Sequence, residues 1–325
     1  MRKTCALLIL FLLLFLPYSK AQNGKSAFRV IGYFHGNLEK DAGKIDFRKI
    51  THLNVAFINP DAAGSFAPVN GLQALVEAAH ARRVKVLASF GGGMAPAYFP
   101  DLIAAARRTA FIANLSKLML DYQLDGIDVD LEGALITADY AGFITDLARA
   151  IKPKGLLTAA VATTYGEQYS LAALQQFDFI NVMSYDQTGP WKPENPGPHA
   201  PFAMATTDLI YWNTTKGIAK EKLSLGLPFY GYSFGPAGAG SMEYRQIIQT
   251  YPGAENRDEV TMQDGGLLYY NGIPTIKMKT KLALVQTGGI MIWQLLQDTT
   301  GTKSLLEVID KQIKGAGKNK QVNKF

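Results

Sequence analysis

Three acidic side chains alternate with aliphatic ones in the segment Asp128-Val129-Asp130-Leu131-Glu132. In an extended strand, side chains two residues apart lie on the same face, roughly 6 to 7 Å from one another. Neighbouring carboxylates in a partly dehydrated site raise one another's pKa. A carboxylic acid that keeps its proton near neutral pH can act as a general acid, and Glu132, the outermost of the three, is our candidate for this role. Asp128 and Asp130 are expected to titrate as a coupled pair that shares a proton.

Two other interpretations of polar segments stay open at this point. The same three carboxylates could hold a hard cation such as Ca²⁺ or Mg²⁺, which binds clustered oxygens. The glycine-rich segment 89–93 could cradle a phosphate, but it lacks the lysine that such loops use. We favour proton transfer by the carboxylates and expect neither a metal nor another cofactor.

Eight short apolar segments are predicted as strands, separated by segments of helical pattern. The strands are expected at residues 28–34, 52–58, 84–90, 126–131, 156–162, 179–184, 223–229 and 289–295. The helices are expected at residues 71–83, 102–122, 137–151, 203–220 and 304–314, with Asp101 and Thr302 as N-caps. This alternation predicts an α/β protein with a (β/α)₈ TIM barrel, whose active site lies at the carboxyl ends of the strands. A doubly wound open sheet is the alternative, although the first strand lacks the glycine-rich fingerprint of that fold.

One interval is too long for a single crossover between neighbouring strands. About 55 residues lie between Tyr232 and Gly288, and they predict a small insertion between strands 7 and 8, at about 233–280, beside the mouth of the barrel. Within it, Asn271-Gly272 is a hairpin signal. We therefore expect one catalytic domain over residues 22–314 and a basic, flexible tail over 315–325.

The N-terminal segment has the layout of a secretory signal peptide. Arg2 and Lys3 precede an apolar run over residues 6–16, and Ser19 and Ala21 are the small residues before a cut near Ala21. As a helix the run would reach about 16 Å, against roughly 30 Å of hydrocarbon, which disfavours an uncleaved anchor. The prediction is a secreted or periplasmic protein with signal peptide 1–21. The only cysteine, Cys5, lies in this segment, so the cleaved chain would have no disulfide and no cysteine nucleophile.

The formal net charge of +6 is concentrated at the two ends of the chain. The first 21 residues carry three basic side chains and no acidic one, and the last twelve carry four lysines, so residues 22–313 have a net charge of −1. Nucleic acids and anionic membranes bind to Lys and Arg concentrated on the fold itself. We therefore expect no nucleic-acid partner and no membrane association after signal cleavage.

Five segments, in chain order, resemble signatures of the family 18 glycoside hydrolases, the chitinase family. They are Ser89-Phe90-Gly91-Gly92, the acidic segment from Asp125 to Glu132, Met183-Ser184-Tyr185-Asp186, Gly226-Leu227-Pro228-Phe229-Tyr230-Gly231 and Gly288-Gly289-Ile290-Met291-Ile292-Trp293. The resemblance implies a (β/α)₈ barrel and a retaining hydrolase that cleaves β-1,4 linkages of N-acetylglucosamine polymers or oligomers. It also implies substrate-assisted catalysis, in which the substrate's acetamido group replaces an enzymic nucleophile.

The resemblance assigns the catalytic roles. Glu132 would protonate the glycosidic oxygen while the acetamido carbonyl attacks the anomeric carbon and forms an oxazolinium. Asp130 would hold the acetamido N–H and exchange a proton with Asp128, and Tyr185 would donate to the acetamido oxygen. Asp125 would brace a turn.

The resemblance also implies a set of sugar contacts, with Trp293 stacked beneath the ring. The expected substrate-binding residues are Tyr33, Phe57, Gly92, Met183, Asp186, Trp191, Tyr230 and Trp293. The partner would be chitin or another glycan that contains N-acetylglucosamine, bound by a monomer. The four histidines, His35, His52, His80 and His199, lack a ligating spacing and are interpreted as structural, with His35 near the mouth.

The sequence departs from the family pattern at three places. Leu131 precedes Glu132 and Gly133-Ala134 follows it, where family members commonly have Trp-Glu-Tyr or Trp-Glu-Phe. Tyr232 stands where an arginine is frequent, and the insertion is short. We therefore expect a shallow, open site. Two alternatives remain: an endo-β-N-acetylglucosaminidase acting on N-glycan chitobiose cores, and a non-catalytic chitin-binding lectin. Such lectins usually lack the acid that Glu132 would provide.

Overall fold

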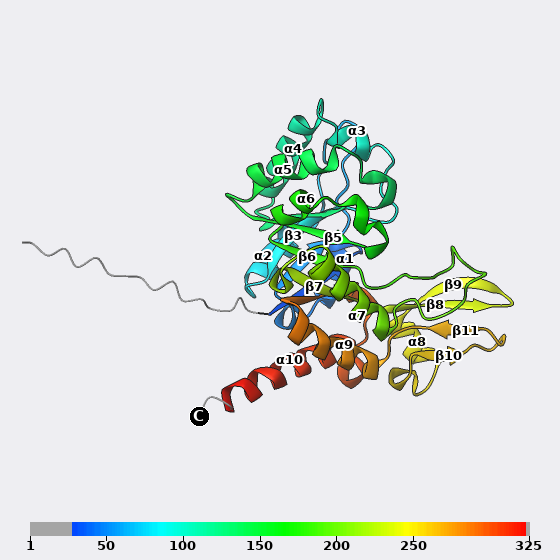
Figure 1. The fold of residues 1–325 in the computed structure, drawn as a ribbon. Helices are drawn as coiled ribbons and strands as arrows, with labels where there is room; N and C mark the ends of the chain where they lie inside the picture. The colour runs from blue at the N-terminus through cyan, green and yellow to red at the C-terminus, as the bar shows by residue number, and fades with distance from the viewer. Residues whose placement is uncertain (1–27, 323–325) are drawn as a thin grey trace, which may run out of the picture.

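Eight parallel strands form a closed barrel in the computed structural model, which describes residues 28–322. The strands pair in the order β1-β12-β7-β6-β5-β4-β3-β2, so β1 closes the ring against β12 (Figure 1). Their bounds are β1 (Arg29–Phe34), β2 (His52–Val55), β3 (Lys85–Gly91), β4 (Gly126–Asp130), β5 (Leu156–Val161), β6 (Phe179–Val182), β7 (Leu223–Pro228) and β12 (Gly289–Trp293). The predicted TIM barrel is confirmed, and the open sheet is excluded. The expected signal peptide lies outside the described residues.

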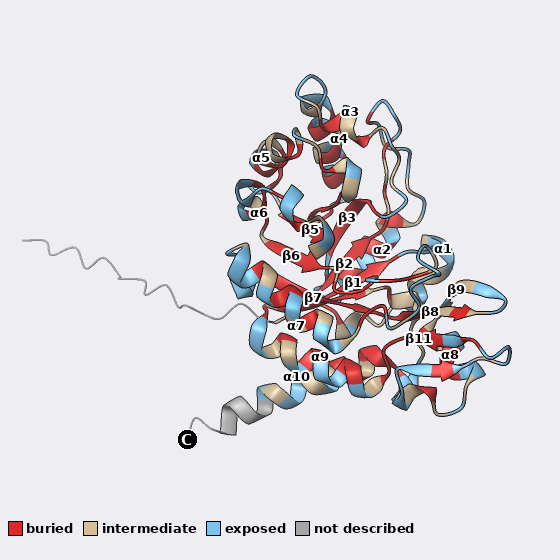
Figure 2. Cartoon of the chain, turned by 45° about the vertical axis from the view of Figure 1, so that its right-hand side comes forward, coloured by how far each residue is buried: buried red, intermediate tan, exposed pale blue. Residues whose placement is uncertain are grey.

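Burial explains why the barrel strands read as apolar runs. The strands form the buried centre of the molecule, and the exposed segments lie around it (Figure 2). On β4, Ile127 and Val129 are fully buried in the hydrophobic layer between strands and helices. The opposite face of the strands points to the barrel axis, where polar side chains such as Asn54, Ser89 and Thr158 are also fully buried. One strand thus supplies both an apolar core and a polar interior.

Helices surround the barrel. They are α1 (Leu38–Asp41), α2 (Leu72–His80), α3 (Phe99–Ile103), α4 (Arg108–Asp121), α5 (Tyr140–Ile151), α6 (Leu171–Gln176), α7 (Phe202–Ile210), α9 (Ile273–Gln286) and α10 (Leu305–Val322). The helix expected at 102–122 is two helices, because Ala104 has a non-helical ψ of 149° and ends α3. The expected N-cap Asp101 is wrong, since it lies inside α3.

The insertion is a small antiparallel sheet with one helix. Its strands pair in the order β10-β11-β8-β9. The elements are β8 (Tyr230–Gly235), β9 (Gly238–Glu243), α8 (Tyr244–Thr250), β10 (Glu259–Thr261) and β11 (Leu267–Tyr269). The predicted hairpin at Asn271-Gly272 is wrong: Asn271 is buried and donates to the carbonyl of Ala200 over 2.9 Å, and Gly272 precedes α9.

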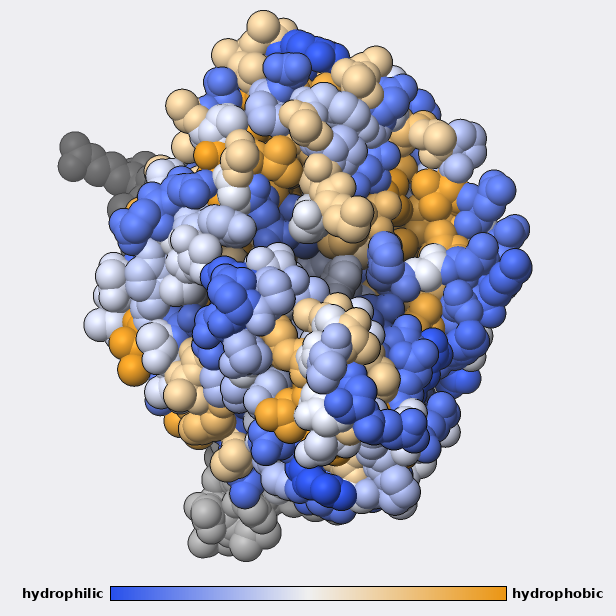
Figure 3. Space-filling model, turned by 90° about the vertical axis from the view of Figure 1, so that its right-hand side faces the viewer, coloured by the Kyte–Doolittle hydropathy of each residue, from blue (hydrophilic) through white to orange (hydrophobic). Residues whose placement is uncertain are grey.

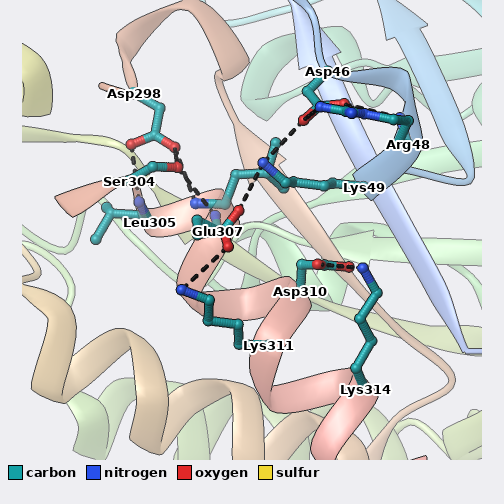
Figure 4. A network of polar contacts seen from close by, with 11 residues as sticks. Asp46, Arg48, Lys49, Asp298, Ser304, Leu305, Glu307, Asp310, Lys311 and Lys314 are labelled. Atoms are coloured by element: carbon teal, nitrogen blue, oxygen red, sulfur yellow. Dashed lines mark hydrogen bonds and ion pairs between the residues drawn. The ribbon is translucent and has the colours of Figure 1, made fainter. Parts of the chain in front are cut away.

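A polar network fixes the last helix to the start of the barrel (Figure 4). The Asp298 carboxylate accepts from the backbone amides of Leu305 and Leu306 at the first turn of α10. Thr302 is not the N-cap, because it lies in a separate 3₁₀ turn, and the Ser304 hydroxyl accepts from the helix instead. Lys49 bridges Asp46 and Glu307, at 2.9 and 2.8 Å. Helix α10 continues past Lys314, where we expected a tail to begin, to Val322.

Within residues 28–322, none of the helices combines the length and the apolar character needed to cross a membrane.

Candidate active site

Strand β4 places the three carboxyl groups on one side of the chain. Asp128 and Asp130 lie in the barrel interior and are 0% and 3% exposed. Glu132 follows directly after the strand and lines a cleft at its carboxyl end. The side chains that alternate with them, at 127, 129 and 131, are fully buried in the surrounding apolar layer. The alternation along β4 therefore places the acidic side chains on one face and the aliphatic side chains on the other, as the sequence predicts.

Asp128 is surrounded by hydroxyl donors. Its carboxylate accepts from Tyr33 at 2.6 Å, from Ser89 at 2.8 Å and from Thr158 at 2.5 Å. Burial raises the pKa of Asp128, whereas these hydrogen bonds stabilise the ionised form and lower it again in part. Asp128 is thus the innermost carboxyl group and the one equipped to carry a charge.

Asp130 has the opposite environment. Its Oδ1 is buried and has no hydrogen-bond partner among the described residues. Burial, together with the charges of Glu132 and Asp128, holds the pKa of Asp130 well above its usual range. Of the two aspartates, Asp130 therefore has the more strongly raised pKa and is the more readily protonated. A buried oxygen without a partner is costly, and a bound ligand that donates a hydrogen bond would satisfy it.

Glu132 has the properties of a general acid near neutral pH. Burial, with a smaller contribution from the charge of Asp186, raises its pKa to about 7. Tyr185 lines the same cleft, and burial raises its pKa well above 10, with added effects of the charges of Asp130 and Asp186. Its hydroxyl thus stays protonated. Among residues 28–322 its hydrogen-bond contact is with the weak acceptor Sδ of Met291, at 3.7 Å, so it can donate to a ligand.

The cleft has a volume of about 1060 Å³ and contains Glu132, Met183, Tyr185 and Trp191 in its lining. A second hollow of about 390 Å³ is lined by Tyr230, Tyr232 and Trp293, among others, and the two hollows share Asp186. The two hollows thus adjoin at Asp186, and we refer to them together as the groove. The face of the molecule in Figure 3 is hollowed near its centre.

A cluster of aromatic rings lies beside the groove, which Trp293 lines. Trp293 is stacked on Phe57, with ring centroids 5.5 Å apart and an interplanar angle of 25°, and tilts against Tyr33 at 5.5 Å. Gly92 lies against Phe57 with a φ of +87°, and a Cβ there would come within 2.4 Å of the ring. His35, exposed at the mouth, lies 5.9 Å from Trp293. Four of the predicted sugar contacts thus lie in, or directly against, this group of rings.

Trp191 lies apart from this aromatic group. It is 54% exposed and touches Tyr232 edge-on, at a centroid distance of 5.4 Å. Of the other predicted contacts, Asp186 and Tyr230 are hydrogen-bonded to one another, the Tyr230 hydroxyl donating to the Asp186 carboxylate over 2.5 Å. Seven of the twelve predicted site residues line the two hollows: Glu132, Met183, Tyr185, Asp186, Trp191, Tyr230 and Trp293.

Other residues lie where local sequence patterns gave no indication. Thr158 and Asn181 reach Asp128 from β5 and β6, each by a single polar side chain in an apolar strand. His199, which we interpreted as structural, contacts Asp186 at 3.1 Å. Asp125 lies at the far end of β4, where it accepts from the amide of Val86 and bonds His80, so it braces the barrel away from the groove.

The described part of the chain contains no group of three His, Cys, Asp or Glu side chains arranged to hold a metal ion.

Comparisons with known proteins agree with this geometry. The model of glycosyl hydrolases family 18 matches residues 29–298. The structure of the GH18 chitinase ChiB from the chitin utilization locus of Flavobacterium johnsoniae is 38% identical, with a TM-score of 0.84, over 89% of this chain and 95% of that one. A chitinase from Bacteroides thetaiotaomicron is 29% identical, with a TM-score of 0.79, over 90% and 98%. Human chitinase-3-like protein 2 is 26% identical over 67% of this chain and 71% of its own. With a family match over most of its length and a barrel of the same topology, the chain belongs to glycosyl hydrolase family 18.

Proposed function

We propose that this protein is an exported, retaining glycoside hydrolase that cleaves β-1,4 linkages of N-acetylglucosamine polymers or oligomers. The observation that carries the proposal is the pairing of Glu132, whose pKa is raised to about 7, with the buried, unpartnered Oδ1 of Asp130 in one cleft. Glu132 can supply a proton at neutral pH. Asp130 provides an acceptor that an acetamido N–H would satisfy.

The proposed reaction assigns a step to each of these groups, as the resemblance to family 18 implies. Glu132 transfers its proton to the glycosidic oxygen as the bond to the anomeric carbon breaks. The substrate's acetamido oxygen forms a new bond to that carbon, which gives an oxazolinium and leaves Glu132 ionised. Asp130 accepts the acetamido N–H, and its proton moves to Asp128 as positive charge develops. Glu132 then takes a proton from the water that opens the ring, so the configuration is retained.

Two side chains would hold the acetamido group in the attacking geometry. The Tyr185 hydroxyl, which has no strong acceptor in the described part of the chain, would donate to the acetamido oxygen. Trp293, held by Phe57 and Tyr33, would support the sugar ring from below. Correct orientation of an intramolecular nucleophile contributes large rate factors, because it replaces a bimolecular encounter. The name of the 38% identical relative, a chitinase from a chitin utilization locus, supports chitin as the substrate.

The decisive experiment compares wild-type protein with Glu132→Gln on N-acetylglucosamine oligomers, with products identified by mass spectrometry. We expect hydrolysis by the wild type, and a loss of more than about a hundredfold in the variant with binding retained. Glu194→Gln, an exposed acid on the loop that carries Trp191, is the control and should retain full activity. Equal activity of Glu132→Gln and the wild type would remove Glu132 from its proposed role.

The same samples separate the alternatives. Release of a mannose-rich glycan from a glycopeptide, with chitin oligomers intact, would select the endo-β-N-acetylglucosaminidase. If the wild type binds oligomers but forms no products, the protein is a lectin. This alternative is tested because one relative is named chitinase-3-like rather than chitinase.

Export depends on residues 1–21, which lie outside the described part. Expression with the native N-terminus, followed by mass analysis, should give a chain that begins at Gln22. An intact chain that begins at Met1 would contradict the predicted cleavage.

A further inference from the structure

His199 lies behind the groove, buried under the residues that form its floor. The residue is 1% exposed. Its Nδ1 is 3.1 Å from a carboxylate oxygen of Asp186, and its Nε2 is 3.3 Å from the backbone carbonyl oxygen of Tyr230. Its ring also packs against the rings of Tyr230 and Tyr232, each with centroids 4.9 Å apart. No role in the mechanism above uses this side chain.

Both ring nitrogens of His199 face groups that can only accept. A carboxylate and a backbone carbonyl have no proton to offer, and a neutral imidazole carries only one N–H. Either neutral tautomer would therefore place a nitrogen lone pair against an oxygen in a buried site. Only the doubly protonated ring donates to both oxygens, and the neighbouring Asp186 carboxylate supplies the counter-charge.

Hydrogen bonds on both sides hold the backbone of the loop that carries His199. The His199 carbonyl accepts from the amide of Gln187 over 3.1 Å. The next carbonyl, of Ala200, accepts from the buried Nζ of Lys279 over 2.8 Å and from the amide group of Asn271 over 2.9 Å. Helix α9 and the end of the insertion thus anchor the loop backbone, and burial confines the ring itself.

We propose that His199 is a positioning residue of this site: a buried imidazolium that donates from both nitrogens, ties β8 to Asp186 and holds the Asp186 carboxylate beside Glu132. The proposal rests on the proposed hydrolase function, which it extends to a residue outside the groove. His199 does not touch the substrate. It acts through Asp186, which lines both hollows of the groove.

The charge of His199 also bears on the acid. The groups facing His199 are Asp186 and the phenols of Tyr230 and Tyr232, with the Lys279 ammonium behind Ala200. The negative charge of Asp186 raises the pKa of Glu132. A positive His199 offsets part of that effect. When His199 is neutral, Asp186 is unbalanced, and the pKa of Glu132 must rise further.

The first test reads the protonation state directly. Protein labelled with ¹⁵N at histidine is recorded by NMR between pH 5.5 and 9, and His199 is assigned by the signal lost in His199→Gln. We expect the shifts of an imidazolium, with two bonded protons, at pH 6. A neutral tautomer at pH 6 would overturn the proposal, whether or not the protein hydrolyses anything.

The second test reads the coupling to Glu132 in the pH profile of kcat/KM on N-acetylglucosamine oligomers. In His199→Gln, we expect the basic limb to move upward by about half a pH unit or more, with kcat reduced more than KM is changed. His80→Gln is the matched control, because His80 also pairs with an aspartate, Asp125, at 2.8 Å, but at the opposite end of β4. Its profile should match the wild type.

The outcomes of the two tests distinguish this proposal from the function on which it rests. Absence of hydrolysis by the wild type would refute the proposed function, and the NMR result would still decide the state of His199. If the wild type hydrolyses the oligomers and folded His199→Gln has the same basic limb as the wild type, the proposed role of His199 is refuted but the proposed function is not. His199→Arg, which keeps the charge, should restore the position of the limb if charge is the cause.

Discussion

Replacement of Glu132 by Gln should make the protein more stable at alkaline pH, although it removes the proposed acid. In the folded protein the pKa of Glu132 is about 7, against 4.5 for an unperturbed glutamate. At 1.36 kcal/mol per pKa unit, this difference corresponds to at most about 3 kcal/mol of folding free energy. A carboxyl group with a raised pKa contributes stability that is complete below pH 4.5 and is lost as the pH rises through 7, because the folded protein holds the proton more tightly.

The measurement is urea denaturation of wild type and Glu132→Gln at several pH values from 4 to 9. Glutamine has no proton to lose, so the difference in unfolding free energy, variant minus wild type, should rise between pH 4.5 and 7 by up to about 3 kcal/mol. Asp130 adds to the effect in the same direction, since the variant removes one of the charges that raise its pKa. Glu194→Gln is the control, which measures how removal of an exposed carboxylate changes the unfolding free energy with pH. A difference that stays constant across this range would show that burial of Glu132 is not what the structure indicates.

Three further predictions test other parts of the structure. Gly92→Ala should lower the free energy of unfolding by about 1 to 3 kcal/mol, because alanine is strained at a positive φ. Its Cβ should also displace Phe57 from Trp293 and so raise KM. Gly217 also has a positive φ but has no neighbour within 4 Å, so Gly217→Ala should show only the loss of stability. If KM rises equally in both, the contact with Phe57 has no role. Lys279 is buried, and burial lowers its pKa to about 7. In urea denaturation, the unfolding free energy of the wild type should therefore increase relative to that of Lys279→Met as the pH rises from 7 to 10.5. A difference between the two proteins that does not change with pH would refute this prediction. EDTA should leave hydrolysis unchanged; inactivation reversed by Ca²⁺ or Mg²⁺ would favour the cation site.

The barrel could be predicted from the sequence because its signal is repeated. Each parallel strand is buried on the side that faces the helices, so eight runs of Val, Ile, Leu and Phe recur at intervals that a helix can fill. Element ends were less predictable, since they depend on single contacts. Ala104 breaks the helical pattern of 102–122 without a proline or glycine, and Ser304 rather than Thr302 caps α10.

The acids of β4 could be predicted for a different reason: the period of two is a local property, and it fixes a shared face without knowledge of the fold. The partners of those acids could not. Thr158 and Asn181 are single polar residues on other strands, and only closure of the barrel brings them to Asp128. The hairpin predicted at Asn271-Gly272 was wrong because the same turn propensity also suits the residues before a helix. The buried hydrogen bond from Asn271 to the carbonyl of Ala200 holds this segment at the start of α9 instead.

The pairing of β1 with β12 joins Arg29 to Gly289, near the two extremes of the fold. During synthesis, therefore, β1 has no neighbour on one side until almost the whole domain has been made, and the nascent sheet has two open edges that can pair with other chains. A truncation before residue 289 should leave an aggregation-prone chain rather than a smaller enzyme.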